Sequence, residues 1–105
     1  MTADNNFLEQ VVGLLTPLGG ISSKSMFGGY GIFHEGAMFG IIKGTGLFFK
    51  VGESNRHDYE KAEAKQYKPM PYYQVPVDVL NNTQALLDWA RASIHVAHEP
   101  TKKRK

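Results

Sequence analysis

Two histidines near the end of the sequence have a spacing that metal sites use. His95 and His98 stand three residues apart in a segment that we predict to be helical, so their imidazole rings would share one face. Imidazole nitrogens bind zinc and nickel, but Glu99 is the only further ligand type close by. The competing interpretation is two solvated histidines that favour the negative end of a helix dipole. We predict no metal and no other cofactor, and we keep binding of a metal or small molecule around His95 and His98 as a third hypothesis.

A glycine-rich segment at residues 27–31, Phe-Gly-Gly-Tyr-Gly, is the next candidate for ligand binding. It lacks the GxxxxGK[ST] spacing of a phosphate loop, and no capped helix follows to present backbone amides to an anion. We therefore interpret it as a turn or bulge between strands. Small residues at such a place also allow a second backbone to approach closely.

A hydrolytic site would need a nucleophile beside a general base. Ser22, Ser23 and Ser25 have no G-x-S-x-G context, and nothing in the spacing pairs them with His34. The mixed charges over residues 53–65 are typical of a solvated helix face held by i, i+4 pairs. The sequence has no cysteine, which excludes disulfides, thiolate metal sites and cysteine nucleophiles. We predict that the protein is not an enzyme.

Aromatic residues concentrate in segments that we predict to be strands. A sheet face with exposed aromatic rings beside Lys43 and Lys50 could stack single-stranded nucleic acid. The competing interpretation is that these rings fill the core, because helices must cover one face of a sheet. No RNP-like sequence supports the nucleic-acid platform. The aromatic residues concerned are Phe27, Tyr30, Phe33, Phe39, Phe48, Phe49, Tyr72 and Tyr73.

The charge of the sequence is divided between a body and a short tail. The net charge is +2, but Lys102, Lys103, Arg104 and Lys105 supply four positive charges after Pro100. Residues 1–101 keep eight basic and ten acidic residues, a net of −2, which repels phosphate. We expect one domain over residues 1–100 and a disordered basic tail over residues 101–105. A contact between this tail and nucleic acid or an acidic partner stays open.

Length and composition indicate one globular domain. With 105 residues, 42% of them hydrophobic and 21% charged, the chain can bury a core without disulfides. The first residues have neither a basic region nor an apolar stretch, and apolar runs fall far short of the roughly 20 residues that span a bilayer. We expect a cytoplasmic protein with no signal peptide and no membrane association.

The first half of the sequence predicts a helix followed by a β-meander. Apolar residues recur at three- and four-residue spacings over residues 4–16, with Asp4 as the cap, and Pro17 with the Gly19-Gly20 pair ends this helix. Short apolar runs bounded by glycine then indicate strands, with Glu35-Gly36 as a tight hairpin turn. Placing these glycines inside helices would cost about 1 kcal/mol each. The predicted strands are residues 21–27, 30–34, 37–43 and 47–51.

The second half predicts a mainly helical segment with one more strand. Ser54 can cap a polar surface helix over residues 55–64. A strand at residues 67–75 should begin near Met70 or lie at a sheet edge, because Pro69 and Pro71 cannot donate to a ladder. A helical turn at residues 76–80 precedes the last helix, which Asn82 or Thr83 caps and Pro100 closes. The fold class is therefore α+β with two layers: an antiparallel sheet, helices on one face, and the order α-β(3-4)-α-β(1-2)-α.

Several separated motifs resemble the N-terminal domain of the TfoX/Sxy family. The hallmark segment is residues 25–33, SMFGGYGIF, and further matches follow in the same order along residues 7–95. These matches are residues 38–40 (MFG), 47–51 (LFFKV), 55–56 (NR), 70–76 (MPYYQVP) and 86–91 (LLDWAR). The resemblance implies a two-layer fold similar to that of secretion chaperones. It provides no catalytic residues.

Fuller members of this family are regulators of natural competence, thought to act with the cyclic-AMP receptor protein at promoters. They carry a second, C-terminal domain, whereas this sequence has only the basic tail, so we expect a stand-alone N-terminal-type domain. The resemblance implies a non-enzymatic regulatory or protein-interaction domain whose partner belongs to the transcription machinery. A homodimer formed through a sheet face or edge is a further expectation. The alternative is direct nucleic-acid binding through the tail and the strand-end lysines. The candidate interaction residues are Lys50, Arg56, Tyr72, Tyr73, Lys102, Lys103, Arg104 and Lys105.

Overall fold

A five-stranded antiparallel sheet forms the centre of the structure, and its strands lie side by side in sequence order. The computed structural model describes residues 3–26, 28–44, 46–68 and 70–99. Phe27, the last residue of the first predicted strand, lies outside this described part, as do Pro100, which is predicted to close the last helix, and residues 101–105 of the predicted tail. The strands are β1 (Ile21–Met26), β2 (Gly29–His34), β3 (Ala37–Lys43), β4 (Gly46–Lys50) and β5 (Tyr72–Gln74). The four-stranded meander and the later fifth strand confirm the predicted order.

Residues with a positive backbone φ angle form the tight turns that join these strands. Glu35 and Gly36 connect β2 to β3 with φ of 48° and 88°, the left-handed pair that a two-residue hairpin requires. Gly28 in the β1–β2 connection also has a positive φ, 75°, whereas Gly29 already belongs to β2. The glycines at these turns therefore select the hairpin geometry, as predicted for Glu35-Gly36.

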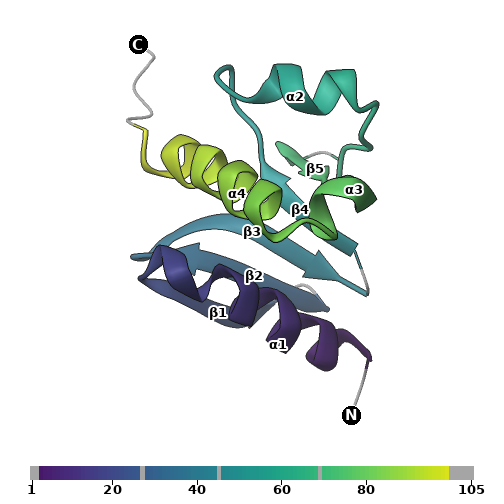
Figure 1. The fold of residues 1–105 in the computed structure, drawn as a ribbon. Helices are drawn as coiled ribbons and strands as arrows, with labels where there is room; N and C mark the ends of the chain where they lie inside the picture. The colour runs from purple at the N-terminus through teal and green to yellow at the C-terminus, as the bar shows by residue number, and fades with distance from the viewer. Residues whose placement is uncertain (1–2, 27, 45, 69, 100–105) are drawn as a thin grey trace.

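All the described helices lie on one face of the sheet, as Figure 1 shows. Helix α1 packs on β1, β2 and β3, while the last helix packs on β3 and β4 and touches α1. This arrangement confirms the two-layer α+β fold. The helices are α1 (Ala3–Leu15), the 3-10 turn η1 (Thr16–Leu18), α2 (Arg56–Lys61), α3 (Val77–Leu80) and α4 (Thr83–His98).

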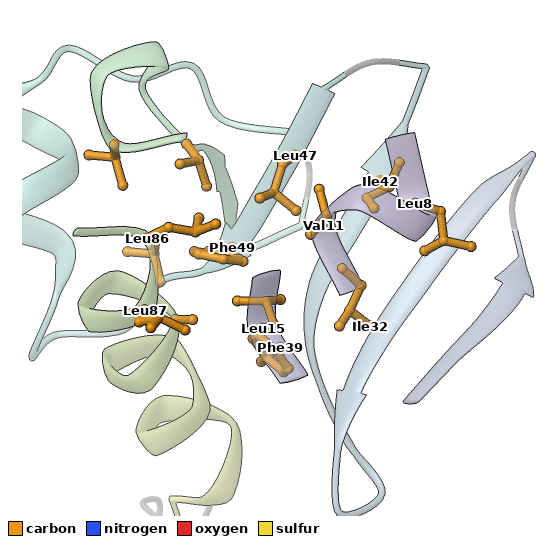
Figure 2. Packing of buried hydrophobic residues seen from close by; sticks show 14 of the residues in the cluster. Leu8, Val11, Leu15, Ile32, Phe39, Ile42, Leu47, Phe49, Leu86 and Leu87 are labelled. Carbon is orange, nitrogen blue, oxygen red and sulfur yellow. The ribbon is translucent and has the colours of Figure 1, made fainter. Parts of the chain in front are cut away.

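The core fills the space between α1, α4 and the sheet (Figure 2). The helices contribute side chains at three- and four-residue spacings, and the strands contribute alternate residues. Phe39 and Phe49 are fully buried, with ring centroids 5.8 Å apart. Other buried members of the core are Leu8, Val11, Leu15, Ile32, Ile42, Leu47, Leu86, Leu87 and Ala90.

The N-terminal caps of the helices agree only in part with the sequence predictions. Asn82 caps α4 as predicted, because its side-chain oxygen accepts the backbone N–H of Ala85 at 3.0 Å. Helix α1 is described from Ala3, and the side chain of Asp4, its predicted cap, lies outside the described part of the structure. The prediction that Ser54 caps α2 is wrong, because that helix begins only at Arg56. Helix α2 is also shorter than predicted, and it is not purely a surface element because Tyr59 is buried.

Gly29 lies where the backbone of β3 passes close to the start of β2. A Cβ atom at this position would overlap the carbonyl oxygen of Ile42, which cannot move without breaking the sheet. Gly31 is different, because a Cβ there would meet the sulfur atoms of Met26 and Met38 at 2.9 Å. Both sulfurs sit at the flexible ends of side chains. The predicted close backbone approach in the glycine-rich segment is therefore located at Gly29.

We expect Gly29→Ala to lower the free energy of unfolding by about 3 kcal/mol, as overpacking against a fixed backbone does. Gly31→Ala should cost less than about 1 kcal/mol, because the methionine side chains can shift. Urea denaturation of the two variants beside the wild type measures the difference. Equal losses would contradict the assignment of the backbone contact to Gly29.

Candidate functional site

The face of the sheet opposite the helices is the main candidate for binding. Residues that pair directly across two strands share a face, and core residues such as Ile32 and Phe49 fix which face is the inner one. We call the opposite side the outer face. The register places Ser22, Lys24, Met26, Gly31, Phe33, Met38, Ile41, Lys43, Phe48, Lys50, Tyr72 and Gln74 on it.

Apolar side chains form a band along this outer face. Met26, Met38 and Phe33 gather over Gly31, whose missing side chain leaves room for them. Farther along the sheet, the ring of Phe48 packs against Tyr67 with centroids 5.2 Å apart. These side chains are half-buried, so they cover the strands and still present part of their surface to solvent. Thioether and aromatic groups of this kind adapt to varied partners.

Three lysines flank the apolar band. Lys24 lies in the middle of β1, Lys43 ends β3 and Lys50 ends β4, and the described strand residues include no aspartate or glutamate. Because β3 and β4 are antiparallel, Lys43 and Lys50 lie at opposite ends of the face, roughly 13 Å apart along β4. Lys43 and Lys50 therefore border the apolar band at its two ends and do not converge on one point. The outer face is positively charged, whereas residues 1–101 taken together are acidic.

The structure brings together two of the predicted interaction residues. Lys50 and Tyr72 are direct cross-strand partners on the outer face. Tyr73 points to the other side, where its ring lies 6.0 Å from that of Tyr59 in the core. Arg56 is exposed at the start of α2. Lys102, Lys103, Arg104 and Lys105 lie outside the described residues.

Arg56 does not extend the lysine face. It lines a broad polar depression of about 660 Å³ between the β4–α2 connection and the end of α4. Glu53 and Glu99 line the same depression, so acidic side chains accompany the guanidinium. This mixed lining favours no particular charge on a ligand.

Tyr72 is a packing residue rather than an exposed contact. Only 3% of its surface is exposed, and its hydroxyl donates to the carbonyl of Met38 at 3.3 Å. Burial raises the pKa of Tyr72 to about 12 from its ordinary value of 10.0. The folded protein thus retains this proton at pH values where the unfolded chain has lost it.

We expect stability to fall as pH rises from 10 to 12. The contribution of neutral Tyr72 is fully present below pH 10 and is lost as pH approaches the folded pKa of about 12. Tyr72→Phe should flatten this decline, without removing it, because burial also raises the pKa of Tyr59. Urea midpoints at pH 9, 10, 11 and 12 test this, and the same slope in the variant and the wild type would contradict it.

The histidines form a different pair from the predicted one. The Nε2 atom of His98 lies 3.0 Å from both Nδ1 and the carbonyl oxygen of His34, which ties the end of α4 to the end of β2. An N–H on His98 Nε2 would donate to these two acceptors. His95 instead faces Glu99 at 3.5 Å. Across the described ranges, no group of three or more metal-ligating side chains comes together.

A buried polar network joins β4, α2 and α4. The side-chain oxygen of Asn55 accepts the N–H of Gly52 at 2.8 Å, and its amide nitrogen donates to the carbonyl of Lys50 at 3.0 Å. The hydroxyl of Ser93 donates to the same carbonyl at 2.9 Å and lies 3.4 Å from the Asn55 amide. Both side chains are at most 2% exposed. Sequence reasoning missed this network, because neither residue stands in a spacing pattern that signals it.

The hydroxyl of Tyr59 lies in the same region without a hydrogen bond. Tyr59 is 1% exposed, and within the described residues its hydroxyl has no partner. Burial raises the pKa of Tyr59 well above the usual range of tyrosine, an effect that the neighbouring Ser93 opposes only in part. The ring itself is well packed, edge-on to Trp89 with centroids 4.7 Å apart.

Asn55→Ala should destabilise the protein by about 2 kcal/mol, because it leaves the N–H of Gly52 without its acceptor and removes one of the two side-chain hydrogen bonds to the Lys50 carbonyl. Tyr59→Phe removes a hydroxyl that has no hydrogen-bond partner among the described residues, so we expect no loss and up to about 1 kcal/mol of gain. Thermal and urea denaturation measure both. A Tyr59→Phe loss as large as that of Asn55→Ala would show that the hydroxyl has a hydrogen-bond partner in solution.

Comparisons with known proteins point to one family. The sequence model of one protein family, described as the TfoX N-terminal domain, matches residues 13–97 of the chain. This range contains the whole sheet, the outer face and nearly all of α4. No curated protein matches the chain. None of the helices in the described part of the chain is long and apolar enough to cross a membrane.

Proposed function

Because the chain belongs to the TfoX N-terminal domain family, we propose that it is a regulatory protein-interaction domain that catalyses no reaction. One observation carries the proposal: the outer face of the sheet combines a half-buried apolar band with three lysines, and no described helix covers it. Such a face is suited to a protein partner with a complementary acidic surface. A cytoplasmic location and a partner in the transcription machinery are parts of this proposal.

The lysines also bear on the predicted homodimer. Two copies packed through their outer faces would bring Lys24, Lys43 and Lys50 of both chains into one interface. Like charges at an interface oppose association. We therefore favour a different protein as the partner, and the homodimer stays a prediction that light scattering can test.

The decisive variant introduces a charge into the apolar band. We expect Phe48→Glu to reduce recovery of the partner at least tenfold, because a carboxylate would be buried against an apolar contact. Val77→Glu is the matched control, since Val77 is 67% exposed on the helix side of the molecule. The measurement is quantitative mass spectrometry of proteins crosslinked to the chain in cells, together with transcript levels and the melting temperature of each variant.

The regulatory proposal requires that Phe48→Glu reproduce the transcript changes seen on deletion, while Val77→Glu leaves transcripts as in the wild type. Identical partners and transcripts in both variants would overturn it. So would a saturable enzymatic activity that a single polar substitution abolishes.

Direct nucleic-acid binding is the second candidate, because the lysines share a face with Phe33 and Phe48. A labelled single-stranded oligonucleotide tests it in the same set of variants by fluorescence anisotropy. Binding that weakens steeply with salt, and again on removal of residues 102–105, would favour nucleic acid over a protein partner. Absence of binding at low salt would exclude it.

A further inference from the structure

The edge of the sheet formed by β1 is open, and we propose that it docks an extended acidic segment of a partner protein as a sixth strand. This proposal rests on the proposed interaction function and specifies how the partner binds. Strand addition supplies affinity through main-chain hydrogen bonds and specificity through alternate side chains. The backbone phase, the side chains and the charge of β1 each support it.

The phase of the β1–β2 ladder determines which backbone groups face outward. The N–H of Glu35 donates to the carbonyl of Gly20 at 2.9 Å, so this pair is a hydrogen-bonded one. In an antiparallel ladder, hydrogen-bonded pairs alternate with pairs that are not hydrogen-bonded. The backbone N–H and C=O groups of Ser22, Lys24 and Met26 therefore also face β2. The N–H and C=O groups of the intervening residues point away from the sheet. These residues are Ile21, Ser23 and Ser25.

The opposite edge of the sheet is already occupied. Residues 65–67 run beside β5: the N–H of Tyr67 donates to the carbonyl of Tyr72 at 2.7 Å, and the N–H of Gln74 donates to the carbonyl of Lys65 at 2.8 Å. Within the described residues, no segment covers β1 in this way, and residues 22–25 are all exposed. The two edges thus differ, and only β1 presents a row of backbone groups for pairing.

The side chains next to this edge indicate what the added strand would carry. Ser22, Ser23, Lys24, Phe33 and Gly36 line a shallow hollow of about 300 Å³. A residue opposite Ser22 would reach past this small side chain toward Phe33, the cross-strand partner of Ser22, which favours an apolar group. A residue opposite Lys24 would share the outer face with it, which favours a carboxylate. The partner segment therefore has an apolar and an acidic residue two positions apart.

Charge also argues against a second copy of this chain at the edge. Antiparallel pairing of two β1 strands centred on Lys24 places the two lysines directly opposite each other. Pairing centred on Ser23 places them on adjacent diagonals, about 7–8 Å apart. A lysine in the middle of an edge strand is a known protection against self-association. The same lysine attracts an acidic strand.

The test uses two blocked synthetic peptides designed to pair antiparallel with β1, Thr-Glu-Thr-Leu-Thr-Val-Thr and the same peptide with Lys in place of Glu. We expect the acidic peptide to bind and to slow amide hydrogen exchange at Ile21, Ser23 and Ser25, measured by NMR. The Lys peptide should bind roughly fivefold more weakly. In Lys24→Glu the order of the two affinities should reverse.

A backbone variant separates strand pairing from simple charge attraction. The N–H of Ser23 points away from β2, so Ser23→Pro removes one docking donor and no bond of the folded sheet. Binding should fall in Ser23→Pro and persist in the matched control Ser23→Ala. If Ser23→Pro lowers the melting temperature strongly, the Lys24→Glu reversal and the exchange data decide the result.

Equal affinity for the two peptides, or unchanged exchange at the three amides with saturating acidic peptide, would overturn the proposal. Dimers that Lys24→Glu disrupts would assign the edge to a second copy and overturn it as well. In cells, a partner lost in Phe48→Glu but retained in Ser23→Pro and Lys24→Glu would leave the proposed function standing and refute the edge. A partner retained in every variant would refute both.

Discussion

The described helices all lie on one face of the sheet, and this constraint shapes the rest of the described structure (Figure 1). A sheet of five strands must protect its second face by its own side chains or by a partner. Here the protection is partial: Met26, Met38 and Phe33 fold over Gly31, and Phe48 packs against Tyr67. Glycines in the strands make this possible because they leave space for neighbouring side chains to lie flat. The same side chains that shield the backbone also provide the apolar part of the outer face.

Lys50 links the two faces of the sheet. Its carbonyl accepts hydrogen bonds from both Asn55 and Ser93 within the protein, while its side chain lies on the outer face beside Tyr72. The buried network therefore fixes the backbone position of a residue whose charged side chain lies on the outer face. An unsatisfied Asn55 or Ser93 would cost more than their hydrogen bonds contribute, so the end of β4 and helix α4 are held in one arrangement. A rigid scaffold under adaptable side chains is what a specific interaction surface needs.

The fold was largely predictable from the sequence, but the site was not. Glycine punctuation identified four strands, and the apolar periodicity identified the long helices, because both patterns are local. The start of α2 was missed because Asn55 uses its side chain inside the core instead of capping a helix. Tyr72 and Tyr73 were treated alike, although alternation places one on each face and only the register with β4 shows which is which. Register, the irregularity between Ile32 and Phe33, and the His34–His98 contact depend on long-range packing that no local pattern encodes.

The position of the lysines is related to the difference between the helix-covered face and the outer face of the sheet. Lysines on an outer face whose described strand residues include no carboxylate oppose pairing between identical chains. The acidic partner proposed above would reverse that effect, since its carboxylates would neutralise the lysines while it covers the apolar band. Repulsion between lysines opposes the association of two identical chains, and this repulsion is absent toward a surface of opposite charge. The affinity of the domain for such a partner should therefore depend on salt as well as on the fit of the apolar residues.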